Sequence, residues 1–326
     1  MTMHAAVVRS FEQPPRYEAY DEPRPNSPDQ ALVDVLAAGL HPRVRTGASG
    51  QHYTSSGTLP MIPGVDGVGR LRDGRRVYFV APDDTWGTFA ERAVVDLRRM
   101  VALPDGADVA KVAAALNPAM SSWVALRRRV HLQAGQSVLV LGATGNAGAM
   151  AVQVAKLLGA GRVVGAGRSR ERLAALAALG ADAVVPLGGD DERTGEDVAS
   201  EAAEVDIVLD YLWGAPARTT MTALLRARRD RSRAMDWIQI GAVAGPTLEL
   251  PSVALRSANL RLQGSGQGSV SAQGYLDELP QLIAEIDAGR VEVAVRPVAL
   301  ADVEAAWTAP EVPGLRTVLV MEPPAG

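Results

Sequence analysis

A turn rich in small residues follows the apolar run "SVLVL" and leads into a helical pattern. It reads "GATGNAG", with Gly142, Gly145 and Gly148 three residues apart and Ala143 at the first glycine position of the pattern G-x-G-x-x-G. Small residues let a dinucleotide pyrophosphate approach the backbone N–H groups at a helix N-terminus. The predicted binding segment comprises Ala143, Thr144, Gly145, Asn146, Ala147 and Gly148. A tight strand-to-helix connection without a ligand is the alternative.

The next apolar run, "RVVGAG", ends at Gly167 and is followed by Arg168, Ser169 and Arg170, with no carboxylate. NAD sites usually place an acidic residue about 20 positions after the glycine turn, where it binds the ribose hydroxyls. A carboxylate would repel a 2′-phosphate, whereas guanidinium groups bind phosphate through bidentate hydrogen bonds. These residues therefore predict NADPH as the cofactor. A charged helical turn without a ligand is the alternative.

Further candidates for the nucleotide site lie where later apolar runs end. Tyr211 follows "VDIVLD", and Gly241, Ala242 and Val243 follow "MDWIQI". In open α/β sheets, ligands bind outside the carboxyl ends of the strands. The stretch "GSGQGS" includes Ser265 and Gly266 and predicts a flexible loop, which either closes over the cofactor or links two domains.

The structural elements that must position these residues are predicted by two kinds of sequence pattern. Residues 1 to about 117 carry short β-favouring runs separated by Pro, Asp, Gly and Asn, which predicts a compact, barrel-like β domain. A helix is expected behind Pro118. From there apolar runs alternate with helices, expected near 146–159 and 169–179, which is typical of a parallel sheet covered on both faces. The elements after Leu260 are too few for a domain of their own and are expected to complete the first one.

The composition excludes several other classes of protein. The chain has 326 residues, of which 47% are hydrophobic and 21% charged, as in a globular protein with room for two domains. Its formal net charge of −4 gives no electrostatic reason to expect nucleic acid as a partner. The lack of cysteine excludes disulfides, thiolate metal sites and cysteine nucleophiles. Without a signal peptide or a long apolar run, we expect a cytoplasmic protein with no membrane partner.

Taken together, the sequence resembles the medium-chain dehydrogenases/reductases, in particular their zinc-free quinone oxidoreductase branch. The resemblance covers almost the whole chain and includes "AAGLH", "IPGVDGVG", "GTFAERAVV", "LNPAMSSWVAL", "AGQSVLVLGATGNAGAMAVQVAKLLGA" and "GLRTVLV". It implies an α/β protein with a GroES-like β-barrel catalytic domain, residues 1–119 completed by 264–326. It also implies a Rossmann domain with a doubly wound parallel sheet, residues 120–263, which binds NADPH.

Zinc-dependent members of this family bind a catalytic metal through Cys, His and Cys, sometimes with Glu. The matching positions here are His41, Val65 with Asp66, and Pro118. One imidazole and one carboxylate cannot form a three-ligand zinc site, so no metal is predicted. Hydride transfer to an electrophilic quinone or enone remains feasible, because the charge that develops on oxygen needs only a hydrogen-bond donor.

The resemblance places the nicotinamide near the loop "HPRVRTGASGQHY" and near "LNPAMSS". The candidate catalytic residues, as hydrogen-bond or proton donors, are His41, Thr46, His52 and Tyr53. Quinone reductases of the family usually carry Asn in place of His41 and Tyr in place of Thr46, so the chain departs from the pattern at both positions. Structural roles for these side chains are the alternative. Asn117 and Ser121 are expected near the cofactor, with local capping as the alternative.

These observations predict an NADPH-dependent reductase that transfers hydride to a quinone or an α,β-unsaturated carbonyl compound without zinc. An enoyl-thioester or biosynthetic enone reductase and a non-catalytic NADPH-binding sensor are the alternatives. The expected partner is a small-molecule substrate. By resemblance we also expect a homodimer, formed through the strand "NLRLQGS" near Leu260.

Overall fold

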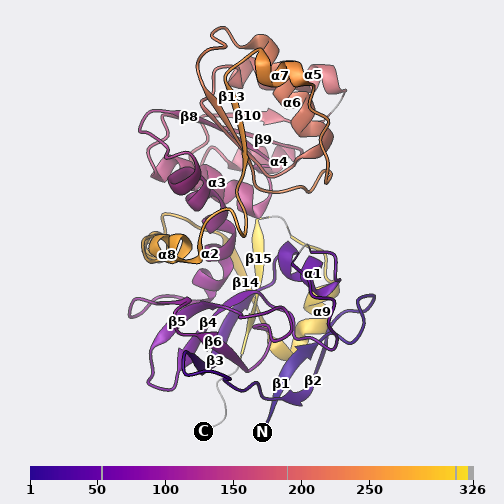
Figure 1. Cartoon of the computed structure of the whole chain (residues 1–326), viewed down its shortest axis with the longest axis vertical. Coiled ribbons are helices and arrows are strands. Elements are labelled where there is room, and N and C mark those ends of the chain that lie inside the picture. Colours follow the sequence, from indigo (N-terminus) through magenta and orange to yellow (C-terminus); the bar gives the residue numbers. More distant parts are fainter. Residues whose placement is uncertain (53, 189, 313, 322–326) are drawn as a thin grey trace. The chain divides into compact units, whose positions relative to one another are not determined.

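The computed structural model describes residues 1–52, 54–188, 190–312 and 314–321. The chain divides into two compact units, whose elements are labelled in Figure 1. Unit 1 comprises Met1–Asn117 and Leu276–Gly326, and unit 2 comprises Pro118–Tyr275. The borders expected from the sequence are 119/120 and 263/264.

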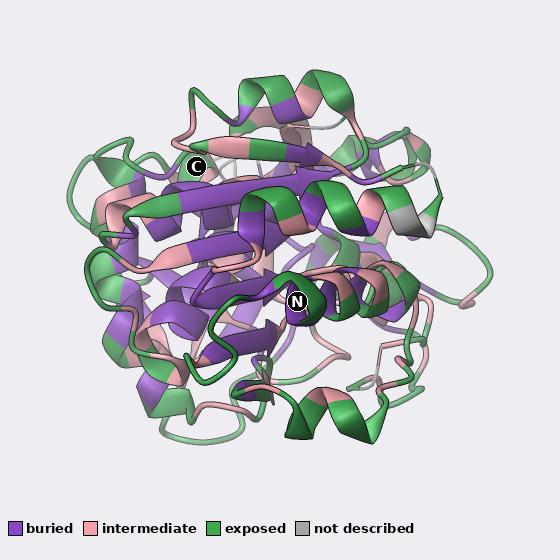
Figure 2. Ribbon diagram, turned by 90° about the horizontal axis from the view of Figure 1, so that it is seen from above, coloured by how far each residue is buried: buried purple, intermediate pink, exposed green. Residues whose placement is uncertain are grey.

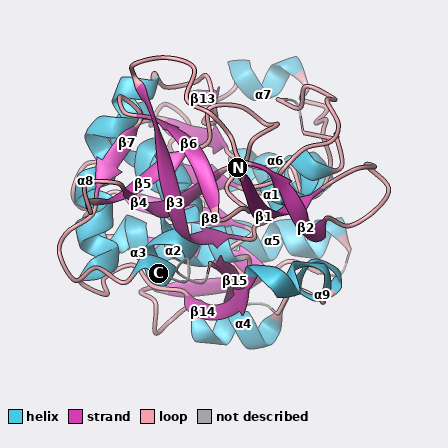
Figure 3. Cartoon of the chain, turned by 90° about the horizontal axis from the view of Figure 1, so that it is seen from below, coloured by secondary structure: helices cyan, strands magenta, loops and turns pink. Residues whose placement is uncertain are grey.

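Unit 1 is built around a mixed sheet with strand order β14-β15-β3-β4-β5-β7, in which β6 also pairs with β3 (Figure 3). The late strand β15 runs antiparallel to β3, with Val318 opposite Gly39, so the C-terminal segment adds to the N-terminal sheet. A separate antiparallel ribbon joins β1 to β2. The strands are β1 Thr2–Val7, β2 Arg16–Asp21, β3 Gln30–Gly39, β4 Asp66–Leu71, β5 Arg76–Val80, β6 Arg92–Asp96, β7 Met100–Ala102, β14 Ala294–Ala299 and β15 Leu315–Val320.

Helices flank this sheet, and its core contains the buried side chains of Val33, Phe79 and Phe89. The helical segments are α1 Pro42–Ala48, α2 Val109–Val124, α8 Ala272–Asp287, η2 Leu300–Asp302 and α9 Val303–Thr308. The expected start of a helix behind Pro118 is wrong, because Pro118 lies inside α2. The helix begins earlier because the Asp108 carboxylate accepts hydrogen bonds from the first backbone N–H groups of the helix.

Unit 2 contains a parallel sheet with strand order β10-β9-β8-β11-β12-β13. Numbered within the unit, this is the order 3-2-1-4-5-6 of a doubly wound dinucleotide-binding fold. The winding direction therefore changes between β8 and β11. The strands are β8 Ser137–Leu141, β9 Arg162–Gly167, β10 Ala183–Pro186, β11 Ile207–Asp210, β12 Met235–Gln239 and β13 Leu260–Gly264.

The central strands are apolar along their length because both faces of this sheet are covered. Every residue of β11 is buried, and Figure 2 shows the strands mainly in purple, with green on the outer sides of the helices. The helical segments are η1 Ala125–Arg129, α3 Asn146–Leu157, α4 Arg170–Ala175, α5 Asp191–Ala202, α6 Gly214–Ala227 and α7 Ser252–Arg256. The predicted fold class, a Rossmann-type parallel sheet with a second sheet domain, is confirmed. Within the described ranges, the helices are too short or too polar to cross a membrane.

Candidate functional site

The turn between β8 and α3 needs glycine at two positions. Gly142 has a φ of +86°, in the left-handed region that other residues rarely adopt. A Cβ on Gly148 would lie 2.2 Å from the Gly142 carbonyl oxygen, so the first turn of α3 packs directly on the loop backbone. The N–H groups of Gly142 and Ala143 both donate to the carbonyl of Ala166, at 2.9 Å. The loop is therefore fixed against the end of β9.

The N-terminus of α3 leaves room for a ligand. Gly145 is the N-cap residue and offers no side chain to the first N–H groups of the helix. In the described part of the chain, a Cβ on Gly145 would come within 4 Å of the Gly142 carbonyl oxygen alone, at 3.4 Å. Thr144, Asn146 and Ala147 belong to the same loop and first turn. N–H groups at the positive end of a helix of this length fit a pyrophosphate.

Three arginines follow β9, beside this turn. Arg168 and Arg170 are exposed. Ser169 caps α4 by accepting a hydrogen bond from the Arg172 N–H at 3.3 Å. The Arg172 guanidinium in turn donates to Asn146 Oδ1 at 3.3 Å, and burial lowers the pKa of Arg172. Arg172 therefore joins the tip of α4 to the start of α3.

Arg172 is a candidate that the sequence interpretation missed. The available signal is its spacing from Ser169, because a residue three positions after an N-cap lies on the first turn and on the same face of the helix.

At the carboxyl end of β11, two predicted residues meet. The hydroxyl groups of Tyr211 and Ser121 are 2.9 Å apart, and Ser121 also donates to the Pro118 carbonyl at 2.6 Å. Burial raises the pKa of Tyr211 to about 12, so its hydroxyl stays protonated at neutral pH. Ser121 and Tyr211 thus form one polar pair inside unit 2.

The loop after Tyr211 is fixed by a buried carboxylate. Asp210 accepts hydrogen bonds from the N–H groups of Leu212 and Trp213 at 2.8 and 2.9 Å, and from the Trp237 indole at 3.0 Å. Burial raises the pKa of Asp210, and the hydrogen bonds oppose that shift. Trp213 has a φ of +53°, a strained conformation for a bulky residue. Asp210 holds this strained turn at the point where the winding direction changes.

The next strand end approaches the same loop closely. A Cβ on Gly241 would lie 2.7 Å from the Tyr211 carbonyl oxygen, so glycine is needed there. The following residues Ala242 and Val243 face outward, and Val243 is 80% exposed. An exposed apolar side chain at the carboxyl edge of the sheet can contact a planar ring.

The loop after β13 is held more firmly than its glycine and serine content predicts. Ser265 is buried, and the Gly266 carbonyl accepts hydrogen bonds from Tyr275 Oη at 3.1 Å and Ser269 Oγ at 2.7 Å. Arg129 donates to the carbonyls of Gly264 and Ser269 at 3.0 and 3.2 Å. These bonds fix the loop to the end of η1 within unit 2.

In unit 1, His41 lies in a buried polar cluster. It contacts Asp66 Oδ1 through Nε2 at 3.1 Å. The same carboxylate accepts hydrogen bonds from Asn117 Nδ2 at 3.0 Å and from Tyr78 Oη at 2.8 Å. Of the residues predicted for the site, the structure thus brings His41 and Asn117 together around Asp66.

The other predicted catalytic residues lie outside this cluster. Thr46 is exposed on α1 and donates to the Arg43 carbonyl at 3.1 Å. The His52 N–H donates to the Thr46 carbonyl, and His52 Nδ1 lies 2.8 Å from Thr54 Oγ1. Burial, followed by the charge of Arg43, lowers the pKa of His52, which favours the neutral ring near pH 7. Tyr53 lies outside the described residues.

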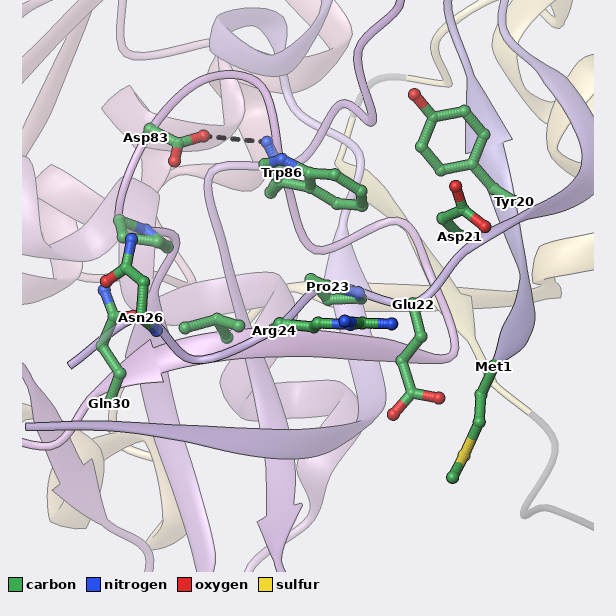
Figure 4. Close-up of a pocket in the computed structure, with 12 residues that line it drawn as sticks. Met1, Tyr20, Asp21, Glu22, Pro23, Arg24, Asn26, Gln30, Asp83 and Trp86 are labelled. Atoms are coloured by element: carbon green, nitrogen blue, oxygen red, sulfur yellow. Dashed lines mark hydrogen bonds between the residues drawn. The ribbon is translucent and has the colours of Figure 1, made fainter. Parts of the chain in front are cut away.

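A cavity of about 570 Å³ opens elsewhere in unit 1 (Figure 4). Figure 4 shows that its lining includes the Trp86 and Tyr20 rings and the side chain of Arg24. The Trp86 N–H donates to the Asp83 carboxylate at 2.9 Å. None of the predicted site residues that the structure describes lines this cavity, and neither does Asp66.

Metal-binding side chains are also dispersed. Among the residues that the structure describes, no three His, Cys, Asp or Glu side chains are grouped closely enough to hold an ion. The cluster at His41 offers one imidazole and one carboxylate, and its remaining members are Tyr78 and Asn117. This donor set does not fit a zinc site of three protein ligands.

The chain is similar in sequence to several known proteins. A family model described as zinc-binding dehydrogenase matches residues 147–287. The "Probable NADPH-dependent quinone reductase tdiC" of Emericella nidulans is 31% identical, over 98% of this chain and 100% of that protein. The trans-enoyl reductase pgmF of Aspergillus terreus is 28% identical, over 67% of this chain and 63% of that protein.

A solved structure extends the likeness to three dimensions. The quinone oxidoreductase of Thermus thermophilus, solved alone and with NADPH, is 27% identical with a TM-score of 0.75, covering 94% of this chain and 95% of that one. The strand order and the glycine turn define a two-unit α/β protein of the dinucleotide-binding type. The chain belongs to the medium-chain dehydrogenase/reductase family, among its quinone oxidoreductase-like members. The resemblance predicted from the sequence is confirmed.

Proposed function

We propose that this chain is an NADPH-dependent reductase that transfers hydride to a quinone or an α,β-unsaturated carbonyl compound without zinc. The observation that carries the proposal is the β8–α3 turn, where Gly145 leaves room above a helix N-terminus. Arginines rather than a carboxylate follow the neighbouring strand. The relatives from Emericella nidulans and Thermus thermophilus, named as quinone reductases and linked to NADPH, support it.

The predicted residues can be assigned to the separate parts of the cofactor. The N–H groups at the start of α3, from Asn146 and Ala147, bind the pyrophosphate. The side chains of Arg168, Arg170 and Arg172 bind the 2′-phosphate through charge-assisted hydrogen bonds. The remaining nucleotide contacts come from Asn117, Ser121, Ala143, Thr144, Gly145, Gly148, Gly167, Ser169, Tyr211, Gly241, Ala242, Val243, Ser265 and Gly266. When bound, NADPH supplies the hydride.

The residues that follow β3 donate the proton and form hydrogen bonds to the substrate oxygen. His41 is the proposed proton donor, because it lies just after β3 and its imidazole is held by the Asp66 carboxylate at 3.1 Å. Thr46, His52 and Tyr53 complete the predicted catalytic set as hydrogen-bond donors and ring contacts. Charge that develops on the acceptor oxygen is stabilised by donors of this kind rather than by a Lewis acid.

A second candidate substrate is an enoyl thioester. The trans-enoyl reductase pgmF of Aspergillus terreus favours it, since it resembles two thirds of this chain. The chemistry is the same addition of hydride to a conjugated carbon, so the distinction lies in the group attached to the carbonyl carbon.

The test is the oxidation of NADPH by purified protein, followed by absorbance, with 1,4-benzoquinone, an α,β-unsaturated ketone and crotonyl-thioester as separate acceptors. Oxidation with the first or second compound is expected. Oxidation with the thioester alone would replace the proposed substrate class. Binding of NADPH without oxidation in any assay would make the chain a non-catalytic sensor, and failure to bind either pyridine nucleotide would overturn the proposal.

We also propose a homodimer that forms through β13, at one edge of the parallel sheet. Leu262 on β13 and Val253 and Leu255 on α7 are exposed apolar residues in this region. Exposed apolar side chains beside an unpaired strand edge suit a self-complementary contact. A cytoplasmic location stays a prediction, to be tested by cell fractionation.

A further inference from the structure

The Asp66 carboxylate is buried and receives several hydrogen bonds. Asp66 is 2% exposed and His41 4% exposed. Asn117 Nδ2 and His41 Nε2 lie 3.0 and 3.1 Å from Oδ1, and Tyr78 Oη lies 2.8 Å from Oδ2. The backbone is fixed as well, because Thr88 Oγ1 donates to the Asp66 carbonyl at 2.8 Å. Three donors on one carboxylate satisfy a buried negative charge.

The hydrogen bonds of Asp66 indicate which ring nitrogen of His41 faces the carboxylate with a hydrogen. Burial and the charge of Asp66 raise the pKa of Tyr78 well above its usual range, so the Tyr78 hydroxyl keeps its hydrogen and donates it to Asp66 Oδ2. An ionised carboxylate accepts hydrogen bonds only, so the hydrogen of the His41 contact belongs to Nε2. Among the residues of the described ranges, no hydrogen bond reaches His41 Nδ1. Nδ1 is therefore the nitrogen that can exchange a proton.

Other charged groups also face the cluster. Arg43 on α1 acts on Tyr78, and Arg316 on β15 acts on Asp66 while it donates to the Leu40 carbonyl at 3.2 Å. Both guanidinium groups add positive charge around the cluster. Within the cluster, the Asp66 carboxylate is the acceptor for the ring of His41.

We propose that Asp66 is the positioning residue of His41: its carboxylate fixes the ring with Nε2–H donated to Oδ1, so that Nδ1 delivers the proton of the reduction. This inference rests on the proposed function. Bound NADPH would supply the hydride to the conjugated acceptor, whose oxygen would gain the electron pair. The N–H bond at Nδ1 of the imidazolium breaks, and an O–H bond forms on the reduced acceptor. The neutral imidazole keeps its Nε2–H bond to Asp66, and water returns a proton to Nδ1.

The first test is the tautomer of His41, measured by ¹⁵N NMR of the histidine side chains in the full-length protein at alkaline pH. The chain has only four histidines, so His41→Gln identifies the signal by its loss. We expect protonated Nε2 and unprotonated Nδ1 in the unmodified protein. A signal from protonated Nδ1 would overturn the proposal, whether or not the protein reduces any acceptor.

The second test compares kinetics of Asp66→Asn with those of the matched variant Thr88→Val, which loses a bond to the backbone of Asp66 and leaves its carboxylate intact. In Asp66→Asn, kcat should fall on the order of 10- to 100-fold. Its KM for NADPH should stay within about twofold, and Asp66→Glu should recover part of kcat. Thr88→Val should keep kcat and the Nε2–H tautomer. Equal losses of kcat in the Asn and Val variants would mean that Asp66 serves the fold alone.

The two tests separate this inference from the proposed function. If the unmodified protein oxidises no NADPH with any acceptor, the function fails while the tautomer still reports on Asp66. If Asp66→Asn does not fold, the tautomer of the unmodified protein and the kinetics of Asp66→Glu decide the question.

Discussion

The three arginines after β9 differ in their surroundings. Arg168 and Arg170 are exposed, whereas Arg172 is half-buried against Asn146 and has no carboxylate partner among the described residues. Water screens the two exposed guanidinium groups, so each contributes little to a contact with phosphate. Arg172 is already partly desolvated and held in place. We therefore expect it to contribute most to the selection of NADPH over NADH.

Arg172→Ala should raise the Kd for NADPH about 10- to 150-fold, since a hydrogen bond to a charged group contributes about 1.5–3 kcal/mol. The Kd for NADH should change less than about twofold, because NADH lacks the 2′-phosphate that accepts this hydrogen bond. Fluorescence titration of both nucleotides measures the two constants. The double variant Arg168→Ala/Arg170→Ala serves as the comparison and should lose less affinity for NADPH. Equal losses for NADPH and NADH in Arg172→Ala would contradict the assignment.

Asp210 provides a pH-dependent contribution to stability. Because burial raises the pKa of Asp210, the folded protein keeps the proton of this carboxyl group to a higher pH than the unfolded chain does. The associated stability is present below the ordinary Asp pKa of about 3.9 and is lost as the pH rises through the folded-state value.

Asp210→Asn removes this titration. The free energy of unfolding of the unmodified protein, minus that of Asp210→Asn, should decrease as the pH rises from about 4 toward neutrality. Urea denaturation at a series of pH values measures it. A difference that increases over this range would show that the hydrogen bonds to Asp210 outweigh its desolvation.

Single residues were predictable from sequence where local spacing determines their role. Gly142, Gly145 and Gly148 form the expected turn because a close helix–strand approach excludes side chains at set positions. The family resemblance places His41 and Asp66 at one site, but local spacing alone does not predict their contact, because it depends on the pairing of strands distant in sequence. The residue before α1 meets the first residue of β4 only when β3 and β4 pair as antiparallel neighbours.

Between elements, the packing of α3 on β8 depends on Gly148 more than on Gly145. Gly148→Ala should lower the free energy of unfolding by about 1–3 kcal/mol or more, because its Cβ would overlap the Gly142 carbonyl oxygen. Gly145→Ala should change stability by less than about 0.5 kcal/mol, since its backbone is extended and its Cβ meets the Gly142 oxygen at 3.4 Å. Urea denaturation of both variants measures this contrast.

The variants Gly145→Ala and Gly148→Ala also distinguish an effect on folding from an effect on cofactor binding. Gly145→Ala narrows the space above the helix N-terminus, so its Kd for NADPH should rise roughly tenfold, or about 1.4 kcal/mol. Unchanged NADPH affinity in a stable Gly145→Ala protein would show that the pyrophosphate binds elsewhere.

Whole elements were predicted best where their pattern is continuous. The apolar runs of β8, β9 and β11 predict buried parallel strands, and these strands form in the expected order along the chain. Pro118 predicts a helix start at the wrong place, because α2 begins earlier, where Asp108 caps it. The π-helical segment at Ala125–Arg129 has no local sequence signal, since it depends on how the end of α2 is held.

For the whole molecule, the donor set predicts catalysis without a metal ion. Dialysis against EDTA or 1,10-phenanthroline should leave the rate of NADPH oxidation unchanged, because the His41 cluster offers too few ligands for catalytic zinc. The rate before and after dialysis, with the metal content of the protein, checks this. Loss of activity that added zinc restores would overturn the metal-free mechanism.

The two edges of the parallel sheet allow a controlled test of the homodimer. Within the described residues, β13 pairs only with β12, and β10 pairs only with β9, so each edge strand can pair further. Leu262 on β13 is 37% exposed and Val184 on β10 is 38% exposed, which makes them matched sites.

Leu262→Glu should convert a dimer to a monomer, because two copies of the new carboxylate would meet across a twofold contact. Val184→Glu places the same charge on the opposite edge and should leave the dimer intact. Light scattering after size-exclusion chromatography gives the masses. Dissociation by Val184→Glu alone would assign the contact to β10, and a monomeric unmodified protein would exclude the dimer.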